Sequence, residues 1–563
     1  MPEYLAPGVY VEEISGGVRP IEGVATSTTG FAGPTERGPT NAQLVTSLTE
    51  FQRKYGGFLS PDDSFMPLAV KGFFDNGGRR LYVARAAPPE LNPAGQPVAP
   101  PASSQDLPAP GGGGVLVSAN GPGAWGDQIF VQVGDPTRPR RIADPANPGQ
   151  TMPDPSQFRL TVLYFDTIPP LPLVDPLDTA NAQNPNRREP ALVERYDNLD
   201  KDPLRGNFVE SIINSQSQLV RVAPIGAAGA AYERPQNNAP GAYEKLDGGR
   251  GNNVANADAI IGLGGDDSNP NDWTGLNALA GIDEVAILCV PDEVNSNLDA
   301  AATSRVRDEL LAQCNRRGDR FAILQLPRTY TGTDRPSLTA LPDTTRAAVY
   351  HPWVRVYNPR ERNTVLVPPG GFVAGVYART DIERGVHKAP ANEDVRGIIT
   401  ADLPNNERPL LVHYTKEQQD ILNPRSVNLI RDFRSDGRGI RVWGARTLSS
   451  DPEWRYVNVR RLFLFVEESI DEGTQWVVFE PNDEPTWAKV RRSITNFLIS
   501  VWRSGALMGT TQVEAFYVRC DRTTMTQDDI DNGRLICYIG IAPVKPAEFV
   551  IFRISQKTVE AAA

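Results

Sequence analysis

The chain has 563 residues, which exceeds the roughly 250 to 300 residues at which one hydrophobic core stops growing, so we expect several domains. Hydrophobic residues make up 40% of the chain and charged residues 22%, values that exclude wholesale disorder and fibrous architectures. The net charge of −11 opposes binding to a polyanion, because such binding depends on neutralising phosphates. Nucleic acid is therefore not an expected partner.

The chemistry-bearing residues are few. Three histidines leave few candidates for a general base or a metal ligand, and the four cysteines contain no C-x-x-C pair. We therefore expect that the protein is not an enzyme and that it binds neither a metal nor a cofactor. We interpret the cysteines as buried apolar side chains. No run of about 18 apolar residues occurs, and the N-terminus does not have the pattern of a signal peptide. We therefore expect no membrane insertion, and synthesis and assembly in a bacterial cytoplasm.

The N-terminal region is predicted to be an arm followed by a compact unit. Residues 3–14 combine β-branched and aromatic residues and run into a flexible segment at 15–20, which predicts an extended arm on a tether. A capping box at Ser47 predicts a short helix. Apolar spacing then predicts a helix over 63–75, and a strand is expected over 80–85.

The middle of the chain divides into two parts. Between Pro88 and Pro155, 15 prolines and 10 glycines occur within 68 residues, so we predict a surface-facing, β-rich insertion over 88–250 with only short strands, such as 128–133. Residues 274–350 differ, because two continuous apolar segments flank a helical one. They predict a strand-helix-strand unit suited to a parallel sheet. Its parts are residues 285–290, 297–317 and 321–326.

The last 200 residues are predicted to hold a major core, since five of the eight tryptophans lie between Trp443 and Trp502. The predicted elements are a strand at 439–446, a helix at 455–471, a strand at 475–480, a helix at 485–504 and strands at 511–520 and 535–541. A strand-like tail over 549–559 follows a proline-bounded segment at 542–546. The chain is thus expected to begin and end with detachable strands.

The helix predicted over 485–504 carries one apolar stripe, which we expect to be buried. Four cations on it have no acidic partner within the helix and indicate either a positive ridge or a solvated face: Lys489, Arg491, Arg492 and Arg503. Acidic residues crowd the end of the preceding helix, without the spacing of a calcium loop: Glu467, Glu468, Asp471 and Glu472. We interpret them as a solvated or partner-facing patch.

Taken in order, the motifs of both ends resemble the contractile tail sheath family of bacteriophages and phage-tail-like injection systems. The N-terminal motifs are PGVYVEE at 7–13, TGFAGPTERGP at 29–39 and FFDNGG at 73–78. Those of the second half are PPGGFVAGVYARTD at 368–381, KAPAN at 388–392, GARTL at 444–448, YVNVRR at 456–461, VFEPN at 478–482 and APVKPAEF at 542–549. Residues 88–250 match no pattern of this family.

The resemblance implies a mixed α/β, multidomain, tail-sheath-like fold whose C-terminal domain is completed by N- and C-terminal strands. The expected parts are an arm and tether at 1–20, a middle α/β domain at 21–87 and 251–365, the outer insertion at 88–250, a C-terminal domain facing an inner tube at 366–548 and an arm at 549–563. The implied function is that of a structural subunit in stacked hexameric rings, which contract and drive the tube through a target envelope.

The resemblance also implies partners and sites. The implied partners are further copies of this chain, the inner tube protein, baseplate proteins and terminator or cap proteins. The implied location is a phage tail or a phage-tail-like particle, which is either released or retained by the host. Strand exchange between subunits is expected at Val9, Tyr10, Val11, Glu12, Phe549, Val550, Ile551, Phe552, Arg553 and Ile554, with hinges at Ser15, Gly16, Gly17, Pro543 and Pro546. Lys489, Arg491, Arg492 and Arg503 are expected to contact the tube.

Two other classes of protein remain as alternatives. A secreted or surface binding protein would use the insertion as its recognition face, although neither a secretion signal nor disulfides are indicated. A cytoplasmic α/β enzyme would use the unit at 274–350, which offers no convergent acid, base or nucleophile.

Overall fold

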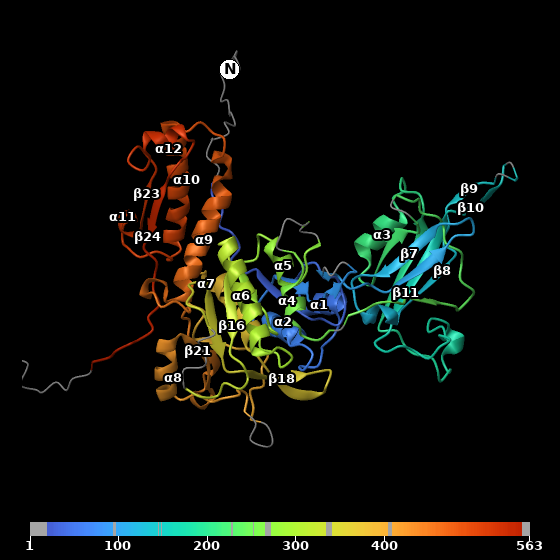
Figure 1. Ribbon diagram of the computed structural model, residues 1–563, viewed down its shortest axis with the longest axis horizontal. Coiled ribbons are helices and arrows are strands. Elements are labelled where there is room, and N and C mark those ends of the chain that lie inside the picture. The colour runs from blue at the N-terminus through green and yellow to red at the C-terminus, as the bar shows by residue number, and fades with distance from the viewer. Residues whose placement is uncertain are drawn as a thin grey trace, which may run out of the picture. The chain divides into compact units, whose positions relative to one another are not determined.

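The computed structural model describes residues 20–93, 97–144, 146–147, 149–226, 229–251, 253–264, 269, 272–333, 341–402 and 408–553. The predicted sites before Pro20 and at Ile554 lie outside these ranges. The chain divides into two compact units (Figure 1). The larger unit comprises 27–379 and 390–450, and the smaller unit comprises the described parts of 1–26, 380–389 and 451–563. The domain boundaries expected from the sequence stay predictions.

The larger unit contains a nine-stranded sheet in the order β2-β3-β1-β15-β16-β17-β21-β22-β20. The strands are β1 Thr29–Gly33, β2 Gln43–Val45, β3 Leu81–Arg85, β15 Ile287–Cys289, β16 Phe321–Gln325, β17 Ala347–His351, β20 Glu393–Asp394, β21 Val427–Phe433 and β22 Gly439–Val442. The central pairs from β3 to β21 are parallel, and antiparallel strands close both ends. The predicted strand-helix-strand unit is confirmed, with α6 Ala300–Arg317 between the parallel β15 and β16.

Helices of this unit pack on both faces of the sheet. They are α1 Leu48–Tyr55, α2 Met66–Asp75, α4 Ala257–Ile261, α5 Gly275–Ala280, α6, α7 Gly370–Arg384 and α8 Lys416–Leu422. On one face, Leu288 and Leu324 belong to the core that also contains residues of α4, α5 and α6. On the other face, the ring of Phe31 meets that of Phe73 from α2, and Tyr350 meets Tyr377 from α7. Burial of both faces explains why the central strands read as continuous apolar segments.

The predicted helix start at Ser47 is confirmed. The Ser47 side chain accepts a hydrogen bond from the Glu50 N–H at 3.1 Å, and the Glu50 carboxylate accepts from the Thr46 N–H at 2.8 Å. Ser47 and Glu50 thus both cap the helix, although Glu50 bonds the N–H of Thr46, the residue before the N-cap, and not that of Ser47 itself.

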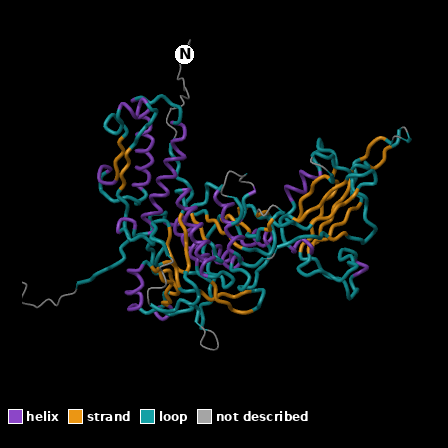
Figure 2. Tube along the Cα trace, viewed as in Figure 1, coloured by secondary structure: helices purple, strands orange, loops and turns teal. Residues whose placement is uncertain are grey.

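The regular elements of residues 90–245 are mainly strands around their own core (Figure 2). The predicted strand at 128–133 is confirmed as β8, whereas β11 and β12, with 8 and 9 residues, are longer than the short strands expected. A four-stranded sheet has the order β12-β11-β8-β14, and a three-stranded sheet has the order β13-β7-β6. Their bounds are β6 Ser104–Pro108, β7 Gly114–Ala119, β8 Ile129–Gly134, β11 Gln157–Tyr164, β12 Leu192–Asp200, β13 Val220–Pro224 and β14 Glu244–Lys245. The remaining elements are the ribbons β4 Glu90–Leu91 with β5 Pro97–Val98 and β9 Arg141–Ala143 with β10 Thr151–Pro153, and the helix α3 Val209–Gln216.

The smaller unit is built on two long helices and a two-stranded ribbon. The helices are α9 Val457–Thr474 and α10 Glu484–Arg503, and the ribbon joins β23 Phe516–Arg519 to β24 Tyr538–Ile541. Short helices α11 Gln512–Ala515 and α12 Gln527–Asp531 complete it. The predicted apolar stripe of α10 is buried, as expected: Trp487, Val490, Ile494, Phe497, Leu498 and Val501.

One predicted strand of this unit is wrong, and another is shorter than expected. Residues 475–480 form a short 3-10 helix, Gln475–Val477, and then a loop in which Phe479 has a φ of 67° and is fully exposed. The apolar run there is a surface loop. The strand expected at 511–520 begins only at Phe516, because the Glu514 carboxylate accepts from the N–H groups of Thr510 and Thr511 and starts helix α11.

Candidate functional site

The ribbon of β23 and β24 has two open edges. Ala542 N–H donates to the Ala515 carbonyl at 2.9 Å, and the constant register pairs Phe516 with Ile541 and Arg519 with Tyr538. Hydrogen-bonded and non-hydrogen-bonded pairs alternate in an antiparallel ladder, so the N–H and C=O groups of Val518, Ile539 and Ile541 point away from it. No further strand pairs with the ribbon among the residues that the structure describes. Each edge therefore offers main-chain donors and acceptors to an added strand.

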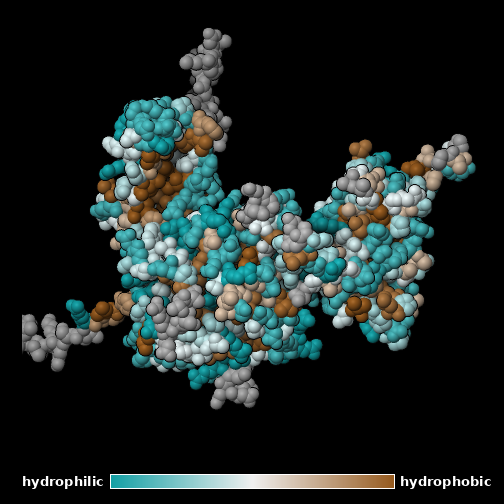
Figure 3. Space-filling model, viewed as in Figure 1, coloured by the Kyte–Doolittle hydropathy of each residue, from teal (hydrophilic) through white to brown (hydrophobic). Residues whose placement is uncertain are grey.

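One face of the ribbon rests on α10. Phe516, Val518, Ile539 and Ile541 belong to the apolar cluster formed with the buried stripe of that helix. Apolar surface is gathered over this part of the smaller unit in the space-filling view (Figure 3). An isolated two-stranded ribbon is only marginally stable in water, so the packing of one face on α10 stabilises this ribbon.

The segment that follows the N-terminal arm is fixed along α9. The Val24 N–H donates to the Ser469 hydroxyl at 3.1 Å, and Ile21 is buried in the same apolar cluster as the α10 stripe. A Cβ on Gly23 would come within 2.8 Å of the Phe465 ring, and one on Gly473 within 2.7 Å of Ile21. Residues 21–26 thus form the root of the N-terminal arm, running antiparallel to α9.

A buried ion pair holds the end of this root. The Arg461 guanidinium donates to both carboxylate oxygens of Asp381 at 2.9 and 2.6 Å and to the Thr26 carbonyl at 2.9 Å. The two side chains are 3% and 2% exposed. Burial raises the pKa of the Asp381 carboxyl, although Arg461 opposes the shift. The pair joins the arm root, the last turn of α7 and α9.

We predict that Arg461→Met lowers the free energy of unfolding of the smaller unit by about 3 to 5 kcal/mol, because it leaves the Asp381 charge buried without a partner. Urea unfolding followed by tryptophan fluorescence measures the loss. The double variant Arg461→Met/Asp381→Leu should recover part of it, since no buried charge then remains. A double variant no more stable than the single one would contradict this account of the pair.

The root of the C-terminal arm is fixed at the start of α9. The Asn458 amide donates to the Val544 carbonyl at 3.2 Å, and the Tyr456 hydroxyl donates to the Glu548 carboxylate at 3.2 Å. The backbone on both sides of Pro543 is hydrogen-bonded as well, through Ala542 and Val544. The hinges at Pro543 and Pro546 stay predictions, and Glu548 is the last of the described residues that is bonded to the start of α9, through Tyr456.

The chain beyond Glu548 exposes four consecutive apolar side chains. Phe549, Val550, Ile551 and Phe552 are between 69% and 83% exposed, and residues 549–553 have no regular secondary structure. Soluble monomers rarely expose contiguous apolar segments, so this one indicates a partner. The N-terminal arm leaves α9 near its end, where Ile21 meets Gly473, and the C-terminal arm leaves near its start, at the other end of a helix of 18 residues and about 27 Å.

The four predicted tube-contact residues are all exposed on α10, but they do not share one face. At 3.6 residues per turn, Lys489, Arg492 and Arg503 lie in one row opposite the buried stripe. Arg491 lies at the margin of the stripe, where its guanidinium contributes to the lowered pKa values of Asp521 and Cys520. Arg491 therefore faces the end of the ribbon and not the row.

The acidic group at the end of α9 is partly neutralised within the chain. The Glu467 carboxylate accepts from Arg460 at 2.7 Å, and Glu468 is half-buried. Asp471 and Glu472 are exposed. Two carboxylates thus remain on the surface beside the root of the N-terminal arm.

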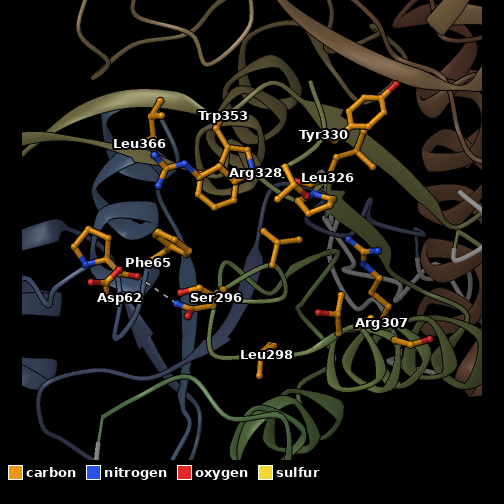
Figure 4. A pocket seen from close by; sticks show the side chains of 18 of the residues that line it. Asp62, Phe65, Ser296, Leu298, Arg307, Leu326, Arg328, Tyr330, Trp353 and Leu366 are labelled. Carbon is orange, nitrogen blue, oxygen red and sulfur yellow. Dashed lines mark hydrogen bonds between the residues drawn. The ribbon is translucent and has the colours of Figure 1, made fainter. Parts of the chain in front are cut away.

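The larger unit has a cavity of about 900 Å³ at the carboxyl ends of β15 and β16, lined by Phe65, Ser296, Leu298, Arg328, Trp353 and other residues (Figure 4). This is where an α/β enzyme would hold its ligand. Two of its polar side chains are engaged in the fold: Arg307 donates to Glu293 at 3.2 Å, and the Asn295 amide donates to the Pro61 carbonyl at 3.3 Å. These contacts support the cavity wall and form no acid, base or nucleophile arrangement.

In the part of the chain that the structure describes, no group of three or more His, Cys, Asp or Glu side chains is placed to hold a metal ion. No helix there is both long and apolar enough to cross a bilayer.

Comparison with known proteins relates the chain to two adjoining family models, which together cover just over half of it. Residues 266–448 match the phage tail sheath protein central domain, and residues 449–557 match the phage tail sheath C-terminal domain. A putative prophage major tail sheath protein of Pseudomonas aeruginosa is 27% identical over 37% of this chain and 51% of its own length. The tail sheath protein of Vibrio phage KVP40 is 28% identical over 34% of this chain and 26% of its own length. The matches thus span about half or less of these relatives.

Solved structures show the same fold along the whole chain. The helical sheath of the anti-feeding prophage in its contracted state has a TM-score of 0.54 at 22% identity and covers 99% of this chain and 100% of its own. The sheath complex of an extracellular contractile injection system, also contracted, has a TM-score of 0.53 at 23% identity with full coverage of both chains. A sheath tail protein of Listeria innocua has a TM-score of 0.53 at 12% identity, and the match covers 93% of this chain and 96% of its own. The predicted mixed α/β, tail-sheath-like fold is confirmed.

Proposed function

The chain belongs to the phage tail sheath protein family, and on this basis we propose that it is the structural subunit of a contractile sheath. Its copies stack as hexameric rings around an inner tube and contract to drive that tube through a target envelope. The role is mechanical, without catalysis. The observation that carries the proposal is the ribbon with two open edges on a chain whose C-terminal arm exposes four apolar residues.

Strand exchange joins the subunits in this proposal. The arm at 549–554 and the arm around Val9–Glu12 add to the open edges of ribbons in neighbouring copies, through main-chain hydrogen bonds. Two arms with about five bonds each, at roughly 0.5 to 1.5 kcal/mol net per bond, supply about 5 to 15 kcal/mol before the cost of ordering them. The roots on α9 transmit each link to the core of the smaller unit.

The tether allows the subunits to move while they remain linked. Residues 15–20 span at most about 20 Å when extended, which permits rotation of a subunit and limits its separation. Contraction requires two packings of the same subunit with a free-energy difference between them. A network of main-chain links survives the change between the two packings.

The grip on the tube is assigned to the row of Lys489, Arg492 and Arg503, facing an acidic tube surface. Exposed ion pairs are individually weak, roughly 0 to 1 kcal/mol, and separate without exposing apolar surface. A sheath that holds its tube and then releases it needs contacts of this kind. The exposed carboxylates of Asp471 and Glu472 are the alternative, against a basic tube.

Baseplate and terminator or cap proteins are the remaining proposed partners, in a phage tail or a phage-tail-like particle. A chain of the anti-feeding prophage baseplate has the same fold, with a TM-score of 0.51 at 23% identity. Negative-stain microscopy of the purified protein tests the proposal directly. Striated hollow cylinders are expected, and compact separate particles at every concentration would contradict it.

The insertion at 88–250 is proposed to lie at the outer radius, so its removal should leave cylinder formation intact. The Arg250 N–H donates to the Pro101 carbonyl at 3.2 Å, so a short Gly/Ser linker can replace residues 102–249. In this variant the Arg85 guanidinium loses the Pro122 carbonyl and keeps the Gly38 carbonyl and the Asn253 side chain as acceptors. Microscopy checks the result. Loss of cylinders from a variant that remains folded would place the insertion in the lattice.

A further inference from the structure

The two cysteines of the smaller unit, Cys520 and Cys537, are opposite each other in space. The ribbon register pairs Arg519 with Tyr538, so the next pair outward is Cys520 with Cys537. Because Ala515 and Ala542 form a hydrogen-bonded pair and such pairs alternate along the ladder, this is a non-hydrogen-bonded position. Opposite Cα atoms there are about 4.5 Å apart, with their side chains close together.

The side chains meet as the register requires. The Cys537 thiol lies within hydrogen-bonding reach of the Cys520 sulfur, and this contact lowers the pKa of Cys520, as does the nearby Arg491 guanidinium. Cys520 is buried and Cys537 is half-buried, and both belong to the apolar cluster beneath the ribbon. Cα atoms between about 4.4 and 6.8 Å apart are the distances at which a disulfide forms without backbone movement.

We propose that Cys520 and Cys537 are a dithiol pair that closes to a disulfide in oxidising surroundings and fastens the open end of the ribbon. The oxidant is a small-molecule disulfide. The sulfur of the half-buried Cys537 attacks one sulfur of the reagent, breaks its S–S bond, releases the first small thiol and keeps the other half of the reagent as a mixed disulfide. The Cys520 sulfur then attacks Cys537 and releases the second. The pair loses two electrons and two protons, and the reagent gains them as two thiols.

The disulfide acts at the end of the ribbon from which residues 521–536 leave and to which they return through α12. The Thr524 hydroxyl donates to the Ile536 carbonyl at 2.9 Å and Met525 is buried, whereas the ion pair of Arg534 with Asp528 is exposed on both sides and contributes little. A covalent link across the loop restricts the unfolded chain and prevents the end of the ribbon from opening. Glutathione keeps the pair reduced in a cytoplasm, and the link forms when the surroundings become oxidising.

The experiment uses the full chain, incubated with oxidised glutathione or with dithiothreitol, then unfolded and treated with iodoacetamide. The reduced sample should carry four alkylated cysteines and the oxidised sample two. Trypsin should release residues 520–522 linked to 535–553 from the oxidised sample, with the loss of two hydrogens. The oxidised protein should also melt about 5 °C or more above the reduced protein.

Matched variants identify the pair. Cys520→Ser and Cys537→Ser should each abolish the linked peptide and the shift in melting temperature, whereas Cys314→Ser, buried in the core of the larger unit, should keep both. Four alkylated cysteines in the oxidised wild-type protein, glutathione adducts in place of the linked peptide, or links only between separate chains would overturn the proposal. Equal melting temperatures of the linked and reduced forms would overturn the fastening of the ribbon. None of these readouts depends on cylinder formation, so they test the pair independently of the sheath function.

Discussion

Removal of residues 549–563 should abolish cylinder formation and leave the subunit folded. Among the described residues Glu548 is the last that is bonded to the start of α9, through Tyr456, and Phe549–Phe552 expose most of their side chains, so we expect the deletion to cost its own unit little. The free energy of unfolding should change by no more than about 0.5 kcal/mol. Circular dichroism with urea unfolding measures the fold, and negative-stain microscopy measures assembly. Removal of residues 1–14 should have the same two effects.

A matched pair of substitutions separates main-chain bonding from apolar contact. Alternate N–H groups of a strand point to opposite sides, so only one of Val550 and Ile551 donates its N–H to the neighbour's ribbon. Proline at that position removes the donor. One of Val550→Pro and Ile551→Pro should therefore weaken assembly strongly, while Val550→Thr and Ile551→Thr, which keep the donor, should still form cylinders. Normal cylinders from both truncations would contradict strand exchange. Failure of the threonine variants alone would indicate that apolar contact, and not the ladder, holds the arm.

The sequence predicted best those elements whose burial leaves a regular pattern. The stripe of α10 recurs every three or four residues because one face of that helix is buried. The segments that became β15 and β16 are apolar throughout because both faces of the sheet are covered. In each case the burial of the element leaves a pattern of apolar residues in its own sequence.

The predictions failed where a local contact outweighed composition. Residues 475–480 have the apolar composition of a strand, yet Val478 and Phe479 lie on an exposed loop between two long helices. The carboxylate of Glu514 starts a helical turn within a segment otherwise typical of a strand. A single hydrogen bond of this kind leaves no periodic pattern in the sequence from which it could be predicted.

The arm roots were missed for a different reason: their partners are distant in the sequence. Arg461 contacts Asp381 and Thr26, which are separated from it by 80 and 435 positions. One signal was present, since Arg461 is a charged residue beside the apolar Leu462 in the helix predicted over 455–471. A buried arginine needs acceptors for its N–H groups, but the sequence does not say which residues supply them.

The second prediction with a large expected effect concerns the grip on the tube. The triple variant Lys489→Glu/Arg492→Glu/Arg503→Glu should remain folded, because all three side chains are exposed opposite the buried stripe. Co-assembly with tube protein should then give empty or prematurely contracted sheaths. Three weak ion pairs per subunit, repeated around every ring, hold the tube in the extended state, and charge reversal turns each attraction into repulsion.

Arg491→Glu is the matched control, since Arg491 faces the end of the ribbon, and it should assemble on the tube normally. Salt gives a second test of the same charges. The Debye length falls from about 8 Å at 0.15 M to about 3 Å at 1 M salt, so the wild-type grip should weaken over that range. If the triple variant still binds the tube in the extended state at physiological salt, the row is not the grip. Charge reversal at Asp471 and Glu472, the exposed carboxylates of α9, then becomes the decisive variant, because a basic tube would require them.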